Sequence, residues 1–264
     1  MKAIILAAGM GTRLDKYTHN MPKCMLNFNG KTLIERQVET LRECGITDIS
    51  AVTGYMKEKI KIKGIKYYNN SDYASTNMVA SLFCAEEEMD DDILVCYGDL
   101  IYEKKVIQKI LDEKADIGVT VDADFLDYWK ARLDDWEKDM ESLVIGHEGN
   151  IVEIGVPRCP MEKARVRYVG LIRFSRKGIE TLKKIFHENK EKYWDKDEKF
   201  MNSKSFRRLY MTDMIQMLID RGVRVNPVIT SHGWLEFDTN EDYEKAVQWL
   251  EDGSLKRFYD IGSV

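Results

Sequence analysis

A glycine-rich loop followed by an arginine lies close to the start of the chain. An apolar run over residues 3–8 leads into the loop 9–12, and Arg13 and the later Lys23 add positive charge. Glycines let a backbone approach an anion closely, and successive N–H groups can then bind phosphate oxygens. The planar guanidinium of Arg13 suits a phosphate group. We therefore predict a phosphate site here. Its contacts are Leu6, Ala7, Ala8, Gly9, Met10, Gly11, Thr12, Arg13 and Lys23.

The loop pattern limits which class of phosphate site is possible. Leu14 stands where a dinucleotide-binding GxGxxG motif has its third glycine, and the GK[ST] sequence of a Walker loop is absent. Dinucleotide dehydrogenases and P-loop kinases are therefore poorly supported. A plainer alternative is a tight turn after a strand, with Arg13 and Lys23 solvated at the surface.

Two aspartates later in the chain follow apolar runs that predict buried strands. Asp99 comes shortly after the run 93–97, and Asp238 lies in the segment 233–239. Ligands of open α/β sheets bind beyond the carboxyl ends of the strands, where Asp99 would lie. Carboxylates, phosphate oxygens and water are ligands that Mg²⁺ prefers. Taken alone, Asp99 fits a turn or a helix N-cap equally well.

Residues 6–14, LAAGMGTRL, followed by MPKCML over residues 21–26, resemble the signature of the sugar-nucleotidyltransferase superfamily. That signature reads L-A-A-G-x-G-(T/S)-R-(L/M) and then P-K. The resemblance implies that the loop holds a triphosphate, and that Arg13 and Lys23 stabilise charge at the α-phosphate and the leaving pyrophosphate. It also implies that Asp99, in the family's Gly-Asp pair, and Asp238, in its late W-x-(D/E)-(I/V)-D-T element, bind Mg²⁺.

The chemistry that this resemblance implies is nucleotidyl transfer to a phosphorylated acceptor. An acceptor oxygen attacks the α-phosphorus in line, while Mg²⁺, Arg13 and Lys23 offset charge in the transition state. A protein nucleophile is not needed, because a phosphate oxygen is already ionised at neutral pH. The four histidines lie in no matching motif and are not expected to be catalytic. They are His19, His147, His187 and His232.

Residues 69–82 resemble the N-x-x-(Y/F)-x-x-T-N-x-x-x-S-L element of phosphocholine cytidylyltransferases and related CTP-using enzymes. These include enzymes that activate phosphonates, or phosphoglutamine in capsule phosphoramidate synthesis. The Q-P-x-G-T-A-like element of hexose-1-phosphate enzymes is absent. The resemblance implies CTP as the nucleotide, with Thr76, Asn77, Ser81 and Asp99 as further nucleotide contacts. Amides and hydroxyls such as those of Thr76, Asn77 and Ser81 can bind cytosine or ribose. Alternatively, Thr76 is only the N-cap of a helix over 77–89.

The acceptor end of the site is open between two chemistries. Acids and aromatics over residues 122–136, with Tyr168, would enclose a quaternary ammonium such as choline. Alternatively, a set of cations would clamp a carboxylate or a further phosphate. Those cations are Arg132, Lys163, Arg165, Arg167 and Arg173. Trp129 and Trp136 would otherwise simply pack on one helix face. The predicted acceptor contacts are Asp122, Asp124, Trp129, Arg132, Tyr168, Arg173 and Glu236.

The apolar pattern predicts the elements that position these residues. Up to residue 121, strands alternate with helices, which is typical of a parallel sheet covered on both faces. The strands are 3–8, 49–53, 65–68, 93–97 and 117–121, and the helices are 32–44, 77–89 and 104–113. Antiparallel strands are predicted at 143–145, 151–154 and 166–174 and late strands at 223–229 and 234–237, with helices at 177–188, 211–221 and 240–250, the last capped by Asn240.

We therefore predict a Rossmann-like, three-layer α/β/α sandwich with a mixed, mainly parallel sheet. One domain, 1–264, would bind the nucleotide mainly through residues 1–121. Residues 122–264 would form the acceptor-binding half and supply the second metal ligand. Two other functions stay open: a sugar-1-phosphate nucleotidylyltransferase, and a non-catalytic nucleotide-binding module. The intact Arg13, Lys23, Asp99 and Asp238 argue against the latter.

Composition excludes several classes of partner. The net charge of −5 disfavours nucleic acid or an anionic membrane as the main partner. The apolar runs fall short of the roughly 20 residues of a membrane span, and the start of the chain does not resemble a signal peptide. Five cysteines without a CxxC pair predict reduced thiols and a cytoplasmic location. A monomer and a homodimer are equally compatible with the sequence.

Overall fold

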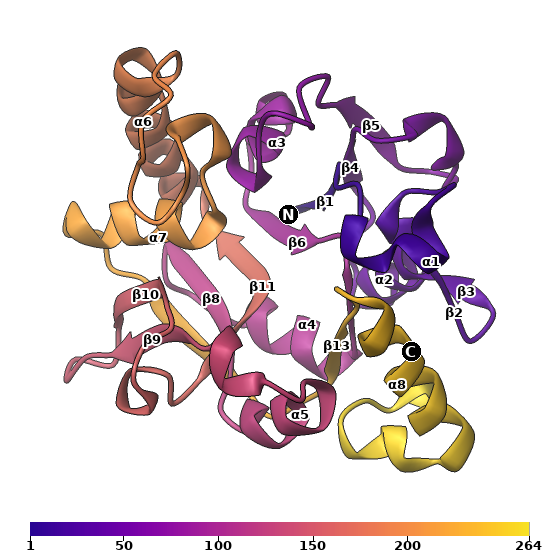
Figure 1. The fold of residues 1–264 in the computed structure, drawn as a ribbon. Helices are drawn as coiled ribbons and strands as arrows, with labels where there is room; N and C mark the ends of the chain where they lie inside the picture. Colours follow the sequence, from indigo (N-terminus) through magenta and orange to yellow (C-terminus); the bar gives the residue numbers. More distant parts are fainter. Residues whose placement is uncertain (264) are drawn as a thin grey trace.

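The computed structural model describes residues 1–263, in which a seven-stranded sheet carries helices on both faces (Figure 1). The strand order is β12-β8-β11-β6-β1-β4-β5. Four neighbouring pairs are parallel, and β11 is antiparallel to both β6 and β8. The predicted mixed, mainly parallel sheet is confirmed. Its strands are β1 (Lys2–Ala7), β4 (Ile49–Thr53), β5 (Lys66–Asn69), β6 (Ile93–Tyr97), β8 (Ile117–Asp122), β11 (Arg167–Phe174) and β12 (Asn226–Thr230).

Strand β1 lies in the middle of the sheet, as its continuous apolar sequence predicts. Ile4 pairs with Ser50 of β4 on one side and with Val95 of β6 on the other. Residues 3–7 are buried on both faces of the sheet. The carboxyl ends of β1 and β6 therefore lie side by side, and the loops that follow them can share one ligand.

The helices divide between two apolar cores, one on each face of the sheet. Helices α2, α4, α5 and α8 contribute to the core that includes Ala3 and Ile5, whereas α3, α6 and α7 contribute to the core that includes Ile4 and Val95. Figure 1 shows α6 and α7 together on the side opposite α2 and α8. The helices are α1 (Asp15–Thr18), α2 (Leu33–Glu43), α3 (Met78–Cys84), α4 (Lys104–Leu111), α5 (Phe125–Arg132), α6 (Arg176–Tyr193), α7 (Met211–Asp220) and α8 (Asn240–Asp252).

Three small two-stranded sheets complete the fold. β2 (Asn27–Phe28) pairs with β3 (Lys31–Thr32), and β9 (Glu141–Ile145) with β10 (Ile151–Pro157). β7 (Leu100–Tyr102) is antiparallel to β13 (Trp234–Glu236). Just beyond this last pair, the backbone N–H of Phe237 donates to the carbonyl of Asp99 over 3.1 Å. The β7–β13 pair thus brings two acidic segments together that are far apart in sequence.

Several predicted boundaries and caps were wrong. The helix predicted over 77–89 ends at Cys84, and its N-cap is Asn77, whose side chain accepts from the N–H of Met78 over 2.9 Å, not Thr76. The last helix is capped by Thr239, which accepts from Asp242 over 3.1 Å, and not by Asn240.

Trp129 and Trp136 do not share a helix face. Trp136 lies in a short 3-10 helix, Trp136–Asp139, beyond the end of α5. Nowhere in residues 1–263 is a helix both long and apolar enough to cross a bilayer.

Candidate active site

The N-terminal loop is shaped by glycines where the sequence predicted a phosphate site. Gly11 has φ 66°, and a Cβ added there would lie 3.0 Å from Cβ of Lys23. Gly98 brings the end of β6 against β1, since its Cβ would lie 2.6 Å from the Leu6 carbonyl oxygen. Larger residues at either position would push the loop away from Lys23 or Asp99.

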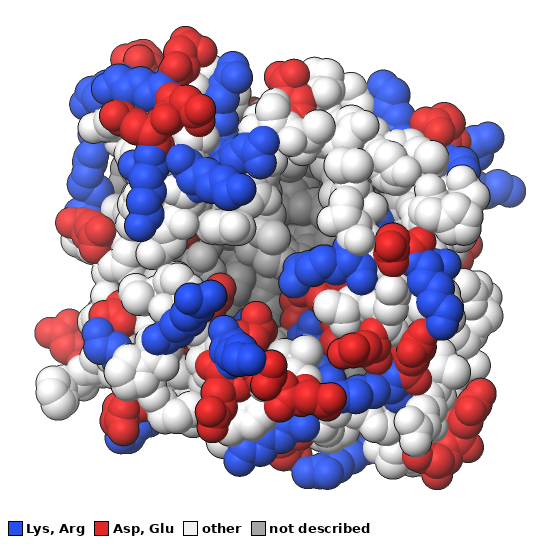
Figure 2. Space-filling view, viewed as in Figure 1, with Lys and Arg blue, Asp and Glu red and all other residues white. Residues whose placement is uncertain are grey.

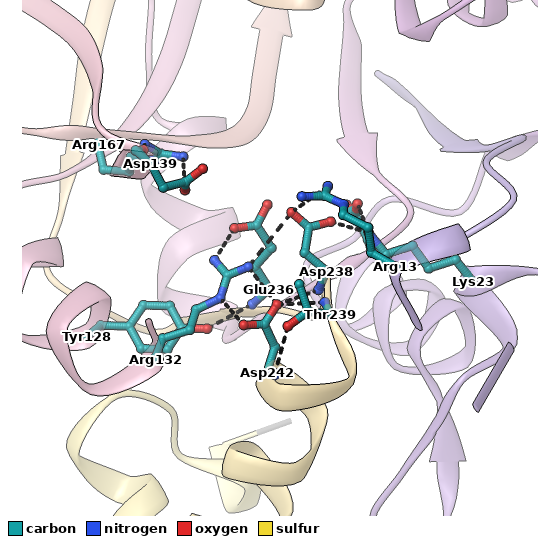
Figure 3. Close-up of polar contacts among 11 residues, drawn as sticks. Arg13, Lys23, Tyr128, Arg132, Asp139, Arg167, Glu236, Asp238, Thr239 and Asp242 are labelled. Atoms are coloured by element: carbon teal, nitrogen blue, oxygen red, sulfur yellow. Dashed lines mark hydrogen bonds and ion pairs between the residues drawn. The ribbon is translucent and has the colours of Figure 1, made fainter. Parts of the chain in front are cut away.

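Lys23 lies between the two aspartates that were predicted to bind metal. Its ammonium donates to Asp99 over 2.6 Å and to Asp238 over a shorter contact. Arg13, on the short helix Thr12–Leu14, forms an ion pair with the other Asp238 oxygen over 3.1 Å (Figure 3). The structure therefore brings together all four residues of the predicted catalytic and metal set.

A buried arginine holds the Asp238 segment from the other side. Arg132, 3% exposed, donates from Nε and Nη2 to both oxygens of Asp242 over 2.9 Å and also contacts Glu236 (Figure 3). Asp242 in turn accepts from the backbone N–H groups of Asp238 over 2.9 Å and Thr239 over 2.8 Å. The capping box of α8 thus fixes the backbone of Asp238.

Burial and charge set opposite protonation tendencies for the two acids of this segment. Burial raises the pKa of Glu236 to about 7, although Arg132 lies beside it. For Asp238, burial opposes ionisation, but Lys23 and Arg13 outweigh it and hold its pKa at about 2. The ammonium of Lys23 is also disfavoured by burial, yet Asp99 and Asp238 raise its pKa. At neutral pH the Lys23–Asp238 pair is therefore fully charged.

The residues present fit a divalent cation that is completed by a triphosphate. Oδ1 of Asp99 is buried and finds no hydrogen-bond partner among residues 1–263. It leaves a free oxygen ligand of the kind that Mg²⁺ prefers. Within residues 1–263, no cluster of three or more histidine, cysteine or acidic side chains could hold a metal by itself. Phosphate oxygens and water would supply the remaining ligands.

A small pocket of about 130 Å³ opens beside the loop, between β1, α3 and the end of β6. Seven of the predicted nucleotide contacts line this pocket: Leu6, Ala8, Gly9, Thr76, Asn77, Ser81 and Asp99. Ala7 is buried, and Met10 is exposed. Tyr73 also lines the pocket and was missed. Thr76 and Ser81 both accept from the buried amide of Asn70, over 3.0 and 2.9 Å.

A larger cavity of about 410 Å³ adjoins the group of Lys23, Asp99 and Asp238, the predicted metal end of the site, and is lined in part by Arg13 and Asp238. Figure 2 shows this face hollowed at its centre, with acidic and basic side chains around the hollow. Of the predicted acceptor contacts, Tyr168 and Glu236 line the cavity. Sequence reasoning missed further lining residues. All of them except Tyr97, which directly precedes the Gly-Asp pair, belong to segments without a recognisable motif. They are Tyr97, Asp139, Glu141, Asn202, Tyr210 and Thr212.

Three predicted acceptor contacts lie elsewhere, in the region around β8 and α5. Asp122 is buried and accepts from the Trp234 indole over 2.8 Å and from two backbone N–H groups. Asp124 lines a separate surface hollow and accepts from Ser231 over 2.6 Å. Trp129 is fully buried and lies under the guanidiniums of Arg132 and Arg167, 4.6 and 4.3 Å from its ring centre. The structure therefore places none of the three at the large cavity.

The position of Arg173 and the partners of Arg132 also differ from those expected of acceptor contacts. Arg173 lies at the far end of β11 from Tyr168, where it donates to the Ala115 carbonyl over 2.8 Å and to Asp92 over 2.7 Å. Five residues of strand place it about 16 Å from Tyr168, outside the site. Arg132 does lie at the site, but its donors are taken up by acidic side chains.

Comparison with known proteins agrees with this geometry. Residues 3–139, just over half of the chain, match the sequence model of the MobA-like NTP transferase domain. The chain belongs to the MobA-like NTP transferase family. The protein is therefore a nucleotidyltransferase, which confirms the enzyme class that the N-terminal loop predicted.

Relatives of this MobA-like NTP transferase include two bacterial cytidylyltransferases. A CTP:phosphoglutamine cytidylyltransferase of Campylobacter jejuni is 32% identical over 259 residues, covering 94% of this chain and 100% of the relative. A choline-phosphate cytidylyltransferase of Streptococcus pneumoniae is 46% identical over 107 residues, covering 39% of this chain and 47% of the relative. Among solved structures, the S. pneumoniae CTP:phosphocholine cytidylyltransferase has a TM-score of 0.73 at 27% identity and covers 94% of this chain and 98% of its own.

Proposed function

We propose that this enzyme transfers CMP from CTP to a small phosphorylated or phosphonylated acceptor and releases pyrophosphate. The observation that carries this proposal is the group in which Lys23 contacts both Asp99 and Asp238 while Arg13 contacts Asp238. The names of the C. jejuni and S. pneumoniae relatives support CTP as the nucleotide. Acceptors of the phosphoglutamine, phosphonate or phosphocholine type fit the same relatives.

The N-terminal loop and the small pocket would divide the nucleotide between them. Backbone N–H groups of residues 8–12 would bind the phosphates, because Gly9 and Gly11 leave room for close approach. The amide and hydroxyl groups of Asn77, Thr76 and Ser81 at the small pocket would bind the base or the ribose.

The transfer step would be in-line attack of an acceptor oxygen on the α-phosphorus. The oxygen–phosphorus bond to the acceptor forms as the bond to the pyrophosphate oxygen breaks, so the pyrophosphate leaves with the bonding electron pair. Arg13 and Lys23 would hold the α-phosphate and the leaving group and offset the charge that develops there. Arg13 is suited to this because its side chain is 67% exposed at the cavity.

Mg²⁺ would be held by Asp99 and Asp238, and when bound it would supply Lewis-acid stabilisation of the phosphate oxygens. Arg132 and Asp242 would keep Asp238 in place through the backbone of the α8 capping box. We also propose that residues 1–121 mainly bind the nucleotide and residues 122–264 mainly the acceptor. A cytoplasmic location and a role in making capsule or cell-surface precursors remain predictions.

The test is pyrophosphate release measured over four nucleoside triphosphates and a panel of acceptors. The panel contains phosphocholine, 2-aminoethylphosphonate, phosphoglutamine and glucose 1-phosphate. We expect turnover with CTP and at least one of the first three acceptors. Asp99→Asn should lower that turnover by about 10²-fold or more. The matched control is Asp197→Asn, at an exposed carboxylate outside the site.

Two outcomes would overturn the proposal. Unchanged turnover in Asp99→Asn would remove the metal role of that carboxylate. Activity with UTP and glucose 1-phosphate, but none with CTP, would instead identify a sugar-1-phosphate nucleotidylyltransferase.

A further inference from the structure

One carboxylate of the large cavity differs from its neighbours because it makes no ion pair within the part of the chain that the structure describes. Glu141, the first residue of β9, lines the cavity. Within the described residues, its carboxylate takes part in no hydrogen bond or ion pair. Asp139 is paired with Arg167, Glu236 with Arg132, and Asp238 with Lys23 and Arg13. Glu141 is therefore the cavity carboxylate that makes no ion pair within residues 1–263, since Arg167, which lines the same cavity, is paired with Asp139.

The surroundings of Glu141 disfavour an unpaired negative charge. The residue is partly buried. Burial raises its pKa; Arg167 opposes this rise, and Asp139 and Asp213 reinforce it. An ionised carboxylate that is taken out of water without a partner destabilises the folded state. A residue of this kind at a ligand cavity is consistent with a cation that arrives with the ligand.

The other walls of the cavity suit the same cation. The rings of Tyr97 and Tyr168 meet edge to face, with centroids 5.7 Å apart, and Tyr210 and Trp234 add further aromatic surface. Aromatic faces attract cations. The side chains of Asn202 and Thr212 supply neutral polar groups that could accept hydrogen bonds. This combination favours a cation that donates hydrogen bonds over one covered by methyl groups.

We propose that the acceptor carries a primary ammonium group, which Glu141 binds inside this cavity. The inference rests on the proposed function, because it names the acceptor class of that same reaction: amino-bearing phosphates or phosphonates. Arg13 and Asp238 line the cavity together with Glu141. A small molecule with its phosphate at Arg13 can therefore place its ammonium at Glu141. A cavity of about 410 Å³ is large enough for such a molecule.

The test compares 2-aminoethylphosphonate with ethylphosphonate, which lacks the amine, in wild type, Glu141→Gln and the control Glu137→Gln. Glu137 is exposed and outside the cavity. Calorimetry gives the affinity of each acceptor, and pyrophosphate release with CTP gives kcat and KM. We expect wild type to bind the amine about 10–100-fold more tightly, as a charge-assisted hydrogen bond would give. Glu141→Gln should abolish this preference, while KM for CTP and binding of ethylphosphonate stay unchanged.

Unfolding by urea gives a second, independent readout. Because the folded-state pKa of Glu141 lies above its unfolded value, its ionisation costs stability above the folded pKa and costs none below the unfolded pKa of about 4.3. Glu141→Gln should therefore be more stable than wild type at pH 8 and equal to it near pH 4. A purely structural carboxylate with a partner would give the opposite sign at pH 8.

The outcomes separate this inference from the proposed function. Transfer from CTP with equal affinity for both acceptors, or an equal loss for both in Glu141→Gln, would overturn the ammonium site and keep the function. Tighter binding of a trimethylammonium acceptor than of a primary amine would also overturn it. Discrimination at Glu141 without transfer from CTP would support the site and overturn the function.

Discussion

The carboxylates at the two ends of the active-site cavity differ in the ion pairs that they make within the protein. At the metal end, Asp238 is held by Lys23, Arg13 and the Arg132 network, so its charge is balanced before any ligand binds. At the acceptor end, Glu141 is partly buried and has no ion-pair partner among residues 1–263. In the proposed reaction the enzyme itself supplies the fixed charges for phosphate chemistry and leaves one charge to be balanced by the acceptor.

The largest expected effect is at Arg132, which joins three acids at the metal end. Arg132→Met should lower the free energy of unfolding by about 3–5 kcal/mol, because it leaves Asp242 and Glu236 without their buried partner. Urea unfolding at pH 7.5 measures this change. The control Arg257→Met removes an exposed ion pair with Asp127 and should cost well under 1 kcal/mol. Equal losses of unfolding free energy in both variants would show that Arg132 does not balance the charges of Asp242 and Glu236.

Lys23 tests the same end through catalysis. Lys23→Met should lower kcat by about 10²–10³-fold, because a charge-stabilising donor is lost. It should also let free enzyme bind Mn²⁺ more tightly without nucleotide, since the ammonium no longer occupies the carboxylates of Asp99 and Asp238. Electron paramagnetic resonance of Mn²⁺ follows the binding. The exposed Lys204→Met should change neither quantity, and unaltered Mn²⁺ affinity in Lys23→Met would show that the lysine does not compete with metal.

Glu88 lies outside the active site and contrasts with Glu141, because its carboxylate is paired within the protein. It accepts from Lys2 over 2.9 Å, from Lys66 over 3.0 Å and from Tyr68. Burial opposes its ionisation, but Tyr68, Lys66 and Lys2 outweigh that effect and hold its pKa at about 2. Its charge therefore stabilises the fold above the unfolded pKa of about 4.3. That contribution is lost as the pH falls through about 2.

The same substitution should thus have opposite signs at the two glutamates. At pH 7.5, Glu88→Gln should lower the free energy of unfolding by about 1–3 kcal/mol, whereas Glu141→Gln should raise it. Urea unfolding between pH 7.5 and pH 3 should show the Glu88 difference shrinking below the unfolded pKa. Glu137→Gln again serves as the exposed control. If both buried sites destabilise on substitution, Glu141 has a partner within the protein.

The smallest effect is expected at Asn77, on the nucleotide side. Asn77→Ala should raise KM for CTP about 3–10-fold, the equivalent of one neutral hydrogen bond. Asn77→Asp keeps the acceptor that caps α3 but loses the amide donor, so it separates the two roles. An unchanged KM for CTP in both variants would leave Asn77 with the capping role alone.

Sequence patterns predicted the sheet, and also which residues meet around Lys23, because both are encoded locally. Buried parallel strands read as continuous apolar runs, and β4 and β6 begin and end at the predicted residues. Arg13, Lys23 and Asp99 follow such strands or lie in short motifs. Asp238 follows β13, and the pairing of β13 with β7 brings it to these residues.

The acceptor end could not be predicted in this way. Glu141, Asn202 and Tyr210 come from three separate segments, and their meeting depends on how the β9–β10 hairpin packs against α7. Asp122 and Arg173 have the side chains of a binding site, yet one fixes Trp234 and the other lies at the wrong end of its strand. Residue type alone does not distinguish a ligand contact from a buried polar anchor.

The position of β11 has a consequence for protein engineering. This strand, from the later part of the chain, is inserted between β6 and β8, which both come from residues 1–122. Exchanging the segment after residue 122 for that of a relative, in order to graft a new acceptor, would replace a central strand and its hydrogen bonds on both sides. Grafts limited to the β9–β10 hairpin and residues 200–212 would instead leave the shared sheet intact while changing the walls of the cavity.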